Sequence, residues 1–170
     1  MRKFFIEMGQ GIMADRADGD FGVCTSALFS CVLIAGYNEA SGFVGAYHYP
    51  ANRIEDPEVI SDMNEWAFEV EPTSVVLIFA RDAGGSGQLG TTSDDRHNLQ
   101  EWVRHRCGVD PQTLEATAAA VSLIGGHFHA GRSTDIACQG IDQGHSTDVS
   151  RHQKGIHMSD GGFILFGRRR

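Results

Sequence analysis

The chain is 170 residues long, enough for one domain with a sizeable buried core. Hydrophobic residues make up 41% of it and charged residues 21%, a composition typical of a folded globular protein rather than a disordered one. Fourteen Lys and Arg against 22 Asp and Glu leave a net charge of −8. This balance argues against nucleic acid as a partner, because phosphate binding depends on clustered cations. No apolar run approaches the ~20 residues of a membrane helix, so we expect no membrane insertion and a single domain over residues 1–170.

The N-terminal segment Met1–Ile6 begins like a signal peptide, with two cations followed by apolar residues. Glu7, Gln10 and Asp15 then interrupt it before an apolar stretch of ~7–15 residues can form. We therefore expect this segment to be a strand of the fold. The protein is expected to be cytoplasmic, or to be secreted into a host cell without a cleaved signal peptide.

The first part of the chain is dominated by strand patterns. Loose alternation indicates a strand over Phe4–Met13, and the acidic, glycine-rich segment Asp15–Gly22 indicates a loop. An apolar, β-branched run at Cys31–Tyr37 is followed by a turn at Asn38–Gly42 and a second strand at Phe43–Tyr49. These last three segments predict a β-hairpin.

The second part of the chain predicts helices as well as strands. The pattern indicates a helix from Pro57 to about Val70, then a strand at Ser74–Ala80 and a glycine-rich loop at Ala83–Gly90. A second helix, capped by Thr92, runs to about Cys107 and is closed by Gly108. A short strand follows at Phe163–Phe166. The alanine-rich segment 114–124 favours a strand in its C-terminal half, and residues 139–160 are expected to form a loop. The sum predicts an α+β fold, with a β-sandwich-like core of hairpin-connected strands flanked by helices.

The hairpin brings together two residues that could do chemistry. Cys31 begins its first strand and His48 lies 17 residues on, near the end of the second, so the fold-back can place them on neighbouring strands. A thiol is mostly protonated at neutral pH, and an adjacent imidazole can take its proton to make a nucleophile. A third group is then needed to orient the imidazole. Thr25, six residues before Cys31, is a candidate for that role.

These residues resemble those of the chemoreceptor glutamine deamidase family, CheD. The resemblance covers about residues 3–110, in the same order and with near-matching spacings. Its most specific parts are the Thr-to-Cys distance of 6 and the Cys-to-His distance of 17. The segments that carry it are Met8–Ala14, Thr25–Cys31, Gly45–Pro50, Phe79–Gly85 and Asp95–Asn98.

The resemblance implies a cysteine-dependent protein-glutamine deamidase that needs no cofactor. Cys31 would attack the carboxamide carbon of a glutamine on a partner protein, with His48 as acid and base and Thr25 in support. Backbone N–H groups near residues 30–31 would hold the oxyanion. The product is glutamate, or a transglutaminated side chain if a primary amine replaces water.

The sequence also departs from the family pattern. The small residues that the family has before its cysteine are here Ala27, Leu28 and Phe29, and Ser30 matches. Bacterial toxins that deamidate glutamine share the same Cys–His core. This chain is therefore interpreted as a divergent toxin or effector in preference to a true chemoreceptor deamidase.

Other cysteines and histidines leave alternatives open. Cys24 becomes the nucleophile if the register is shifted, whereas Cys107, at the carbonyl end of a helix, is expected to be structural. Nothing around Cys138 indicates activation, and the spacing of the four cysteines predicts free thiols. His127 and His129 share one face of an extended segment and could bind a metal with Cys138 or His145. The expected spacings of a metal site are absent, so none is predicted.

Three further functions compete with deamidation. Gly85, Gly87 and Gly90 fit the glycine pattern of a dinucleotide-binding motif. That motif also needs an acidic residue at the end of a second strand about 20 residues further on, and a helix is predicted there instead. A cysteine peptidase or amidase acting on small amides would use the same Cys31 and His48. A non-catalytic protein-binding module would keep the fold and leave Cys31 inert, and crowding of the thiol by Phe29 would favour it.

Overall fold

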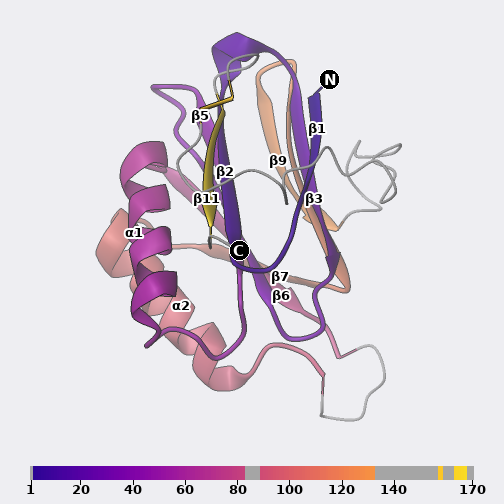
Figure 1. The fold of residues 1–170 in the computed structure, drawn as a ribbon, viewed down its shortest axis with the longest axis vertical. Coiled ribbons are helices and arrows are strands. Elements are labelled where there is room, and N and C mark those ends of the chain that lie inside the picture. Colours follow the sequence, from indigo (N-terminus) through magenta and orange to yellow (C-terminus); the bar gives the residue numbers. More distant parts are fainter. Residues whose placement is uncertain (1, 83–88, 133–156, 159–162, 168–170) are drawn as a thin grey trace.

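The computed structural model is an α+β protein in which two helices and two mixed β-sheets pack together (Figure 1). The structure describes residues 2–82, 89–132, 157–158 and 163–167, and the fold is given for these residues. Helix α1 spans Pro57–Val70 and helix α2 spans Ser93–Cys107. No helix among the described residues is long and apolar enough to cross a membrane.

The strands form a smaller and a larger sheet. The smaller sheet has the order β1-β3-β8-β9, with β1 at Arg2–Ile6, β3 at Phe21–Ala27, β8 at Ala118–Ile124 and β9 at His127–Arg132. The larger sheet has the order β10-β11-β2-β5-β4-β6-β7, with β10 at His157–Met158, β11 at Phe163–Gly167, β2 at Gln10–Asp15, β5 at Phe43–Tyr49, β4 at Val32–Tyr37, β6 at Ser74–Ala80 and β7 at Gln112–Ala116. The pairs β1–β3 and β6–β7 are parallel and the other pairs are antiparallel.

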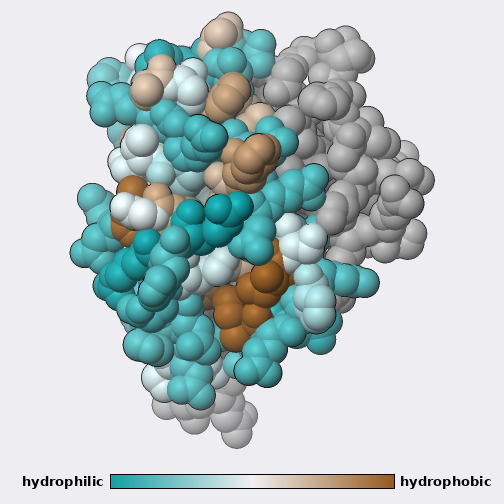
Figure 2. All heavy atoms as spheres, turned by 90° about the vertical axis from the view of Figure 1, so that its left-hand side faces the viewer, coloured by the Kyte–Doolittle hydropathy of each residue, from teal (hydrophilic) through white to brown (hydrophobic). Residues whose placement is uncertain are grey.

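The molecule has three layers, with the larger sheet in the middle. Both helices lie on one side of this sheet and the smaller sheet lies on the other (Figure 1). One apolar core fills the space between the two sheets, and a second lies between the larger sheet and the helices. Figure 2 looks onto the helix side, where hydrophilic side chains cover most of the surface and hydrophobic ones gather in small separate areas. Because the larger sheet is covered on both faces, its strands β4 and β5 are buried almost throughout.

Local signals set the ends of both helices, which match the predicted bounds. The Asp56 side chain accepts a hydrogen bond from the Glu58 N–H, with Pro57 in the first turn of α1. In α2 the Thr92 hydroxyl accepts from the backbone N–H three residues on, and Gly108 ends the helix with φ of +70°. These caps need no tertiary contact, so the sequence could reveal them.

Helix α1 packs closely on the strands of the predicted hairpin. The Trp66 indole lies over two glycines, Gly36 in β4 and Gly45 in β5. A Cβ at Gly45 would come within 2.6 Å of the indole nitrogen and 2.7 Å of a Val70 methyl, and a Cβ at Gly36 would come within 2.8 Å of the indole ring. Hydrogen atoms in place of Cβ therefore allow the indole to rest on the backbone of the sheet.

The hairpin of β4 and β5 and the strands β6 and β11 agree with the sequence-based predictions, but three segments differ. The single strand expected over Phe4–Met13 is two strands, β1 and β2, because Gly9 turns the chain with φ of +81°. The loop expected over Asp15–Gly22 holds a 3-10 helix at Arg16–Asp18, and β3 begins at Phe21. The segment 114–124 is divided between β7 and β8, one in each sheet. Of the expected loop 139–160 the structure describes residues 157–158, which form strand β10 instead, and the rest lies outside the described residues.

Candidate active site

Cys31 follows a tight turn between β3 and β4. Its N–H donates to the Leu28 carbonyl across 2.6 Å, and Phe29, inside the turn, has φ of +45°. A bulky residue rarely adopts this left-handed conformation, so the turn carries backbone strain. Two contacts from other segments hold it, since the Leu28 N–H donates to Thr117 and the Phe29 carbonyl accepts from Gly90. Phe29 itself is 64% exposed.

The carbonyl side of Cys31 is held by a threonine from the segment before α2. The Thr91 hydroxyl donates to the Cys31 carbonyl across 3.3 Å and accepts from the Ala80 N–H across 2.8 Å. Both ends of the Cys31 backbone unit are thus hydrogen-bonded, and the position of Cβ is fixed by the main chain.

The structure places Cys31 and His48 on the same face of the larger sheet. His48 in β5 pairs with Leu33 in β4, and Cys31 lies two residues before Leu33. Cys31 lies one residue before β4 and packs against the core between the two sheets, the side on which His48 meets Ile6, so the two side chains share this side of the larger sheet. Cys31 is half-buried at the margin of the core between the sheets, and His48 is 2% exposed.

The imidazole of His48 is held by the smaller sheet. Its Nδ1 atom lies 3.3 Å from the Ile6 carbonyl oxygen in β1, and its own carbonyl accepts from the Gly9 N–H across 2.8 Å. Burial lowers the pKa of His48 to about 4, although the Ile6 carbonyl favours the charged ring. The ring is therefore neutral at pH 7. Its Nε2 atom is buried without a hydrogen-bond partner, and no hydrogen bond joins it to the Cys31 sulfur.

Thr25 lies next to this arrangement rather than at its centre. It is buried in β3, where it pairs with Ile6, whose carbonyl holds His48. Its hydroxyl accepts from the Ala119 N–H across 3.4 Å, beside the irregularity in the pairing of β3 with β8. Thr25 thus fixes the backbone next to the residue that orients the imidazole.

The surroundings of the Cys31 thiol favour its neutral form. Burial raises the pKa of the thiol above its ordinary value, the backbone N–H of Ala51 lowers it, and the nearby Asp95 carboxylate raises it again. Together with the lowered pKa of His48, this means that the resting pair is a thiol and a neutral imidazole. In the resting structure, therefore, Cys31 keeps its proton and His48 has not accepted it.

Sequence reasoning did not identify Asp95 as part of the site. Its buried carboxylate accepts from the Tyr49 hydroxyl across 2.8 Å and from the Asn52 N–H across 2.7 Å. The Tyr49 hydroxyl in turn accepts from the Arg53 N–H across 2.9 Å. This network holds the segment after β5, which carries the Ala51 N–H toward Cys31. The signal in the sequence was an acidic residue in the first turn of a helix, which ordinarily indicates capping alone.

The expected oxyanion donors near residues 30–31 are only partly available. The Cys31 N–H is engaged with the Leu28 carbonyl. The Ser30 N–H makes no hydrogen bond with the described residues, and the Ala51 N–H faces the sulfur. Of the expected donors, the Ser30 N–H is therefore the one not engaged with the described residues, and the Ala51 N–H is available to an oxyanion only once it leaves the sulfur.

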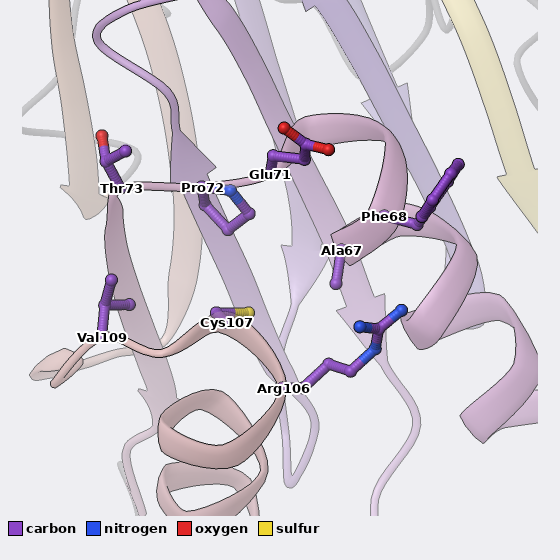
Figure 3. A pocket seen from close by; sticks show the side chains of 8 residues that line it. All are labelled: Ala67, Phe68, Glu71, Pro72, Thr73, Arg106, Cys107 and Val109. Carbon is purple, nitrogen blue, oxygen red and sulfur yellow. The ribbon is translucent and has the colours of Figure 1, made fainter.

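The other cysteines lie elsewhere. Cys24 packs with Ala120 on the outer face of the smaller sheet, away from His48. Cys107 borders the core on the helix side, and burial raises its pKa to about 11. Figure 3 shows it in a hollow of about 380 Å³ between the ends of α1 and α2. Cys138 lies outside the described residues.

The remaining candidate sites find little support in the described part of the chain. His127 and His129 are exposed in β9, and no group of three or more potential metal ligands gathers among the described residues. His145 lies outside these residues, and so do Gly85 and Gly87 of the dinucleotide-like pattern.

Comparison of the chain with protein-family models, with curated proteins and with solved structures returned no match. The fold and the geometry around Cys31 therefore carry the functional argument.

Proposed function

We propose that the chain is a cysteine-dependent protein-glutamine deamidase with a CheD-like fold, in which Cys31 is the nucleophile and His48 the general base. The observation that carries the proposal is the unpartnered Nε2 atom of His48, on the same sheet face as Cys31. A buried polar atom without a partner costs stability, and among the four such atoms of the described residues Nε2 is the basic nitrogen. The Thr25, Cys31 and His48 spacings of the CheD resemblance agree with this assignment.

The reaction would begin from the neutral pair. The Cys31 sulfur attacks the carboxamide carbon of a bound glutamine while its proton moves to Nε2 of His48. The N–H groups of Ser30 and Ala51 then face the oxyanion. The imidazolium gives the proton to the departing ammonia as the C–N bond breaks, leaving a thioester. His48 next takes a proton from water, which attacks the thioester, and the thiol is restored as glutamate leaves.

A neutral imidazole has a free nitrogen for a proton, but a ring with a pKa near 4 is a weak base, so the proposal requires bound substrate to raise the pKa of His48 before Cys31 transfers its proton. An imidazole with a pKa near 4 is deprotonated throughout the physiological range, and Nδ1–H is held by the Ile6 carbonyl. Thr25 would act as a positioning residue, because it supports the strand that carries Ile6. A rotation of the imidazole or a shift of the turn at Phe29 would bring Nε2 and the sulfur into contact when substrate binds.

The second candidate is a non-catalytic protein-binding module. The raised pKa of Cys31 and the lack of a hydrogen bond between its sulfur and Nε2 favour this reading. In that case Cys31 is a packing residue at the margin of the core.

A proteome-wide conversion assay separates the two candidates. A bacterial and a eukaryotic cell extract are each incubated with the wild-type protein, with Cys31→Ser and with Cys24→Ser, and glutamines that gain about 1 Da are mapped by mass spectrometry. We expect conversions with the wild type and with Cys24→Ser but not with Cys31→Ser. Added methylamine would give the corresponding amide if the thioester accepts amines. Equal patterns for the wild type and Cys31→Ser would overturn the proposal in favour of the binding module.

A further inference from the structure

A groove opens between the two sheets at one edge of the sandwich. Strand β7 ends the larger sheet and β9 ends the smaller one, and the two strands contact each other. Two hollows, of about 420 and 610 Å³, are lined by residues of both strands and share His129 and Ala130. The hollows are therefore parts of one groove, bordered by the edges of two sheets.

Two arginines, Arg81 and Arg132, line the larger hollow, although the chain carries a net charge of −8. Arg81, His129 and Arg132 line it, and all three are exposed. Its acidic lining residue, Glu115, is bound by Arg96 across 2.8 Å. The carboxylate of Glu115 is thus already compensated by Arg96, so the Arg81 guanidinium is the charge that an anionic group would meet at this end of the groove.

This hollow lies close to the candidate nucleophile. The Thr91 hydroxyl bridges the Cys31 carbonyl and the Ala80 N–H, and Ala80 pairs with Ala116 at the end of β7. Since paired strands are about 4.8 Å apart, one strand spacing and one bridging side chain separate Cys31 from Ala116, a distance on the order of 10 Å. The Arg81 N–H donates to the Ala116 carbonyl, so Arg81 stands at the end of the groove nearest the turn of Cys31.

We propose that this β7–β9 groove binds an extended, acidic segment of the protein substrate, with a carboxylate of that segment on Arg81. The inference rests on the proposed function and specifies its substrate class. An extended chain could pair with an open sheet edge and reach Cys31 with its glutamine. Since an extended chain advances about 3.3 Å per residue, the acidic residue should stand about three positions from the glutamine.

Binding and turnover are measured separately to test this. The probes are fluorescent peptides with one glutamine and with glutamates about three positions to either side, and matched peptides with lysines there. Binding is read by anisotropy with the Cys31→Ala variant, which cannot react. Arg81→Glu is compared in that background with Arg106→Glu, an exposed arginine at the end of α2 on the helix side. Turnover of the same peptides by the protein with Cys31 intact is read as ammonia release.

We expect the glutamate peptides to bind at least about tenfold more tightly than the lysine peptides. Arg81→Glu should abolish this preference and Arg106→Glu should keep it. Equal binding of both peptides, or equal effects of both substitutions, overturns the docking site. Ammonia release without a preference for glutamate would leave the deamidase intact and refute the groove. Selective binding that depends on Arg81, without ammonia release, would support the groove and count against the deamidase.

Discussion

The Nδ1 atom of His48 lies 3.3 Å from the Ile6 carbonyl oxygen, and this contact decides which nitrogen of the ring can act as a base. A carbonyl oxygen only accepts hydrogen bonds, so Nδ1 carries the proton of the neutral ring. Nε2 is then the basic atom, and it is the one without a partner. His48 belongs to the larger sheet and Ile6 to the smaller, so the docking of the two sheets sets the tautomer.

Burial of His48 predicts a loss of stability in mild acid. Its pKa falls from 6.5 in the unfolded chain to about 4 in the fold, so the unfolded state binds more protons between these values. The free energy of unfolding is therefore unaffected by this titration above pH 6.5 and decreases as the pH falls toward 4, by on the order of 3 kcal/mol in all. Urea unfolding of the wild type and of His48→Gln should measure it. Glutamine can still donate a hydrogen bond to the Ile6 carbonyl but does not titrate. If the free energy of unfolding of the wild type and of His48→Gln depended on pH in the same way, the prediction would be contradicted.

Alkylation of Cys31 by iodoacetamide should depend on the Asp95 carboxylate. Burial and this carboxylate raise the pKa of the Cys31 thiol above its ordinary value, and the rate of alkylation follows the thiolate fraction. Because the Asp95 carboxylate raises the pKa of Cys31, Asp95→Asn should move the Cys31 profile to lower pH. Mass spectrometry of the separate peptides gives each profile. Asp94→Asn, in the same helical turn, is the matched control and should leave the pH dependence of Cys31 alkylation unchanged. If Asp95→Asn also left it unchanged, the electrostatic coupling between Asp95 and Cys31 would be refuted.

Asp95 should also matter for stability. Its carboxylate is buried and accepts hydrogen bonds from the Tyr49 hydroxyl and the Asn52 N–H. Asp95→Ala leaves both donors without their acceptor and should lower the free energy of unfolding by about 2–4 kcal/mol. Asp94→Ala, at an exposed position, should cost less than about 0.5 kcal/mol. Equal midpoints of chemical denaturation for the two variants would show that the network carries no net stability.

Gly45 should tolerate no side chain while Trp66 is present. A Cβ at this position would come within 2.6 Å of the indole nitrogen and 3.1 Å of the Ile12 carbonyl. We expect Gly45→Ala to destabilise the protein by about 1–3 kcal/mol through overpacking. Trp66→Leu replaces the indole by a smaller side chain and should relieve part of this cost. The double variant with Gly45→Ala should therefore lose less free energy of unfolding than the sum of the losses in the two single variants. Strict additivity in thermal or chemical unfolding would exclude a clash between the two residues.

The segment 114–124 could be predicted only in part: the strand favoured in its C-terminal half is confirmed as β8, but β7 was missed. Its alanines are compatible with a helix, and the apolar end favoured a strand in the C-terminal half alone. In the structure it supplies β7 to the larger sheet and β8 to the smaller. β7 pairs with β6, about 40 residues earlier, whereas β8 pairs with β3, about 100 residues earlier, and with the neighbouring β9. Because β propensity depends on such neighbours, no pattern inside the segment could identify β7.

The sequence by itself determined the elements whose signals are local. Pro57 and Thr92 start the helices, Gly108 ends the second, and the apolar runs around Asn38–Gly42 define the hairpin that carries Cys31 and His48. Each of these features depends on residues a few positions apart, which is why bounds could be predicted closely.

Only the tertiary structure decided the chemistry around the candidate nucleophile. It placed the Ile6 carbonyl on His48, 42 residues away, the Thr91 hydroxyl on the Cys31 carbonyl, 60 residues away, and Asp95 on Tyr49. It also buried His48 and raised the pKa of Cys31, so that the pair rests neutral. Burial and electrostatic neighbours arise when sheets and helices pack on one another, and a pKa depends on these surroundings rather than on the residue type.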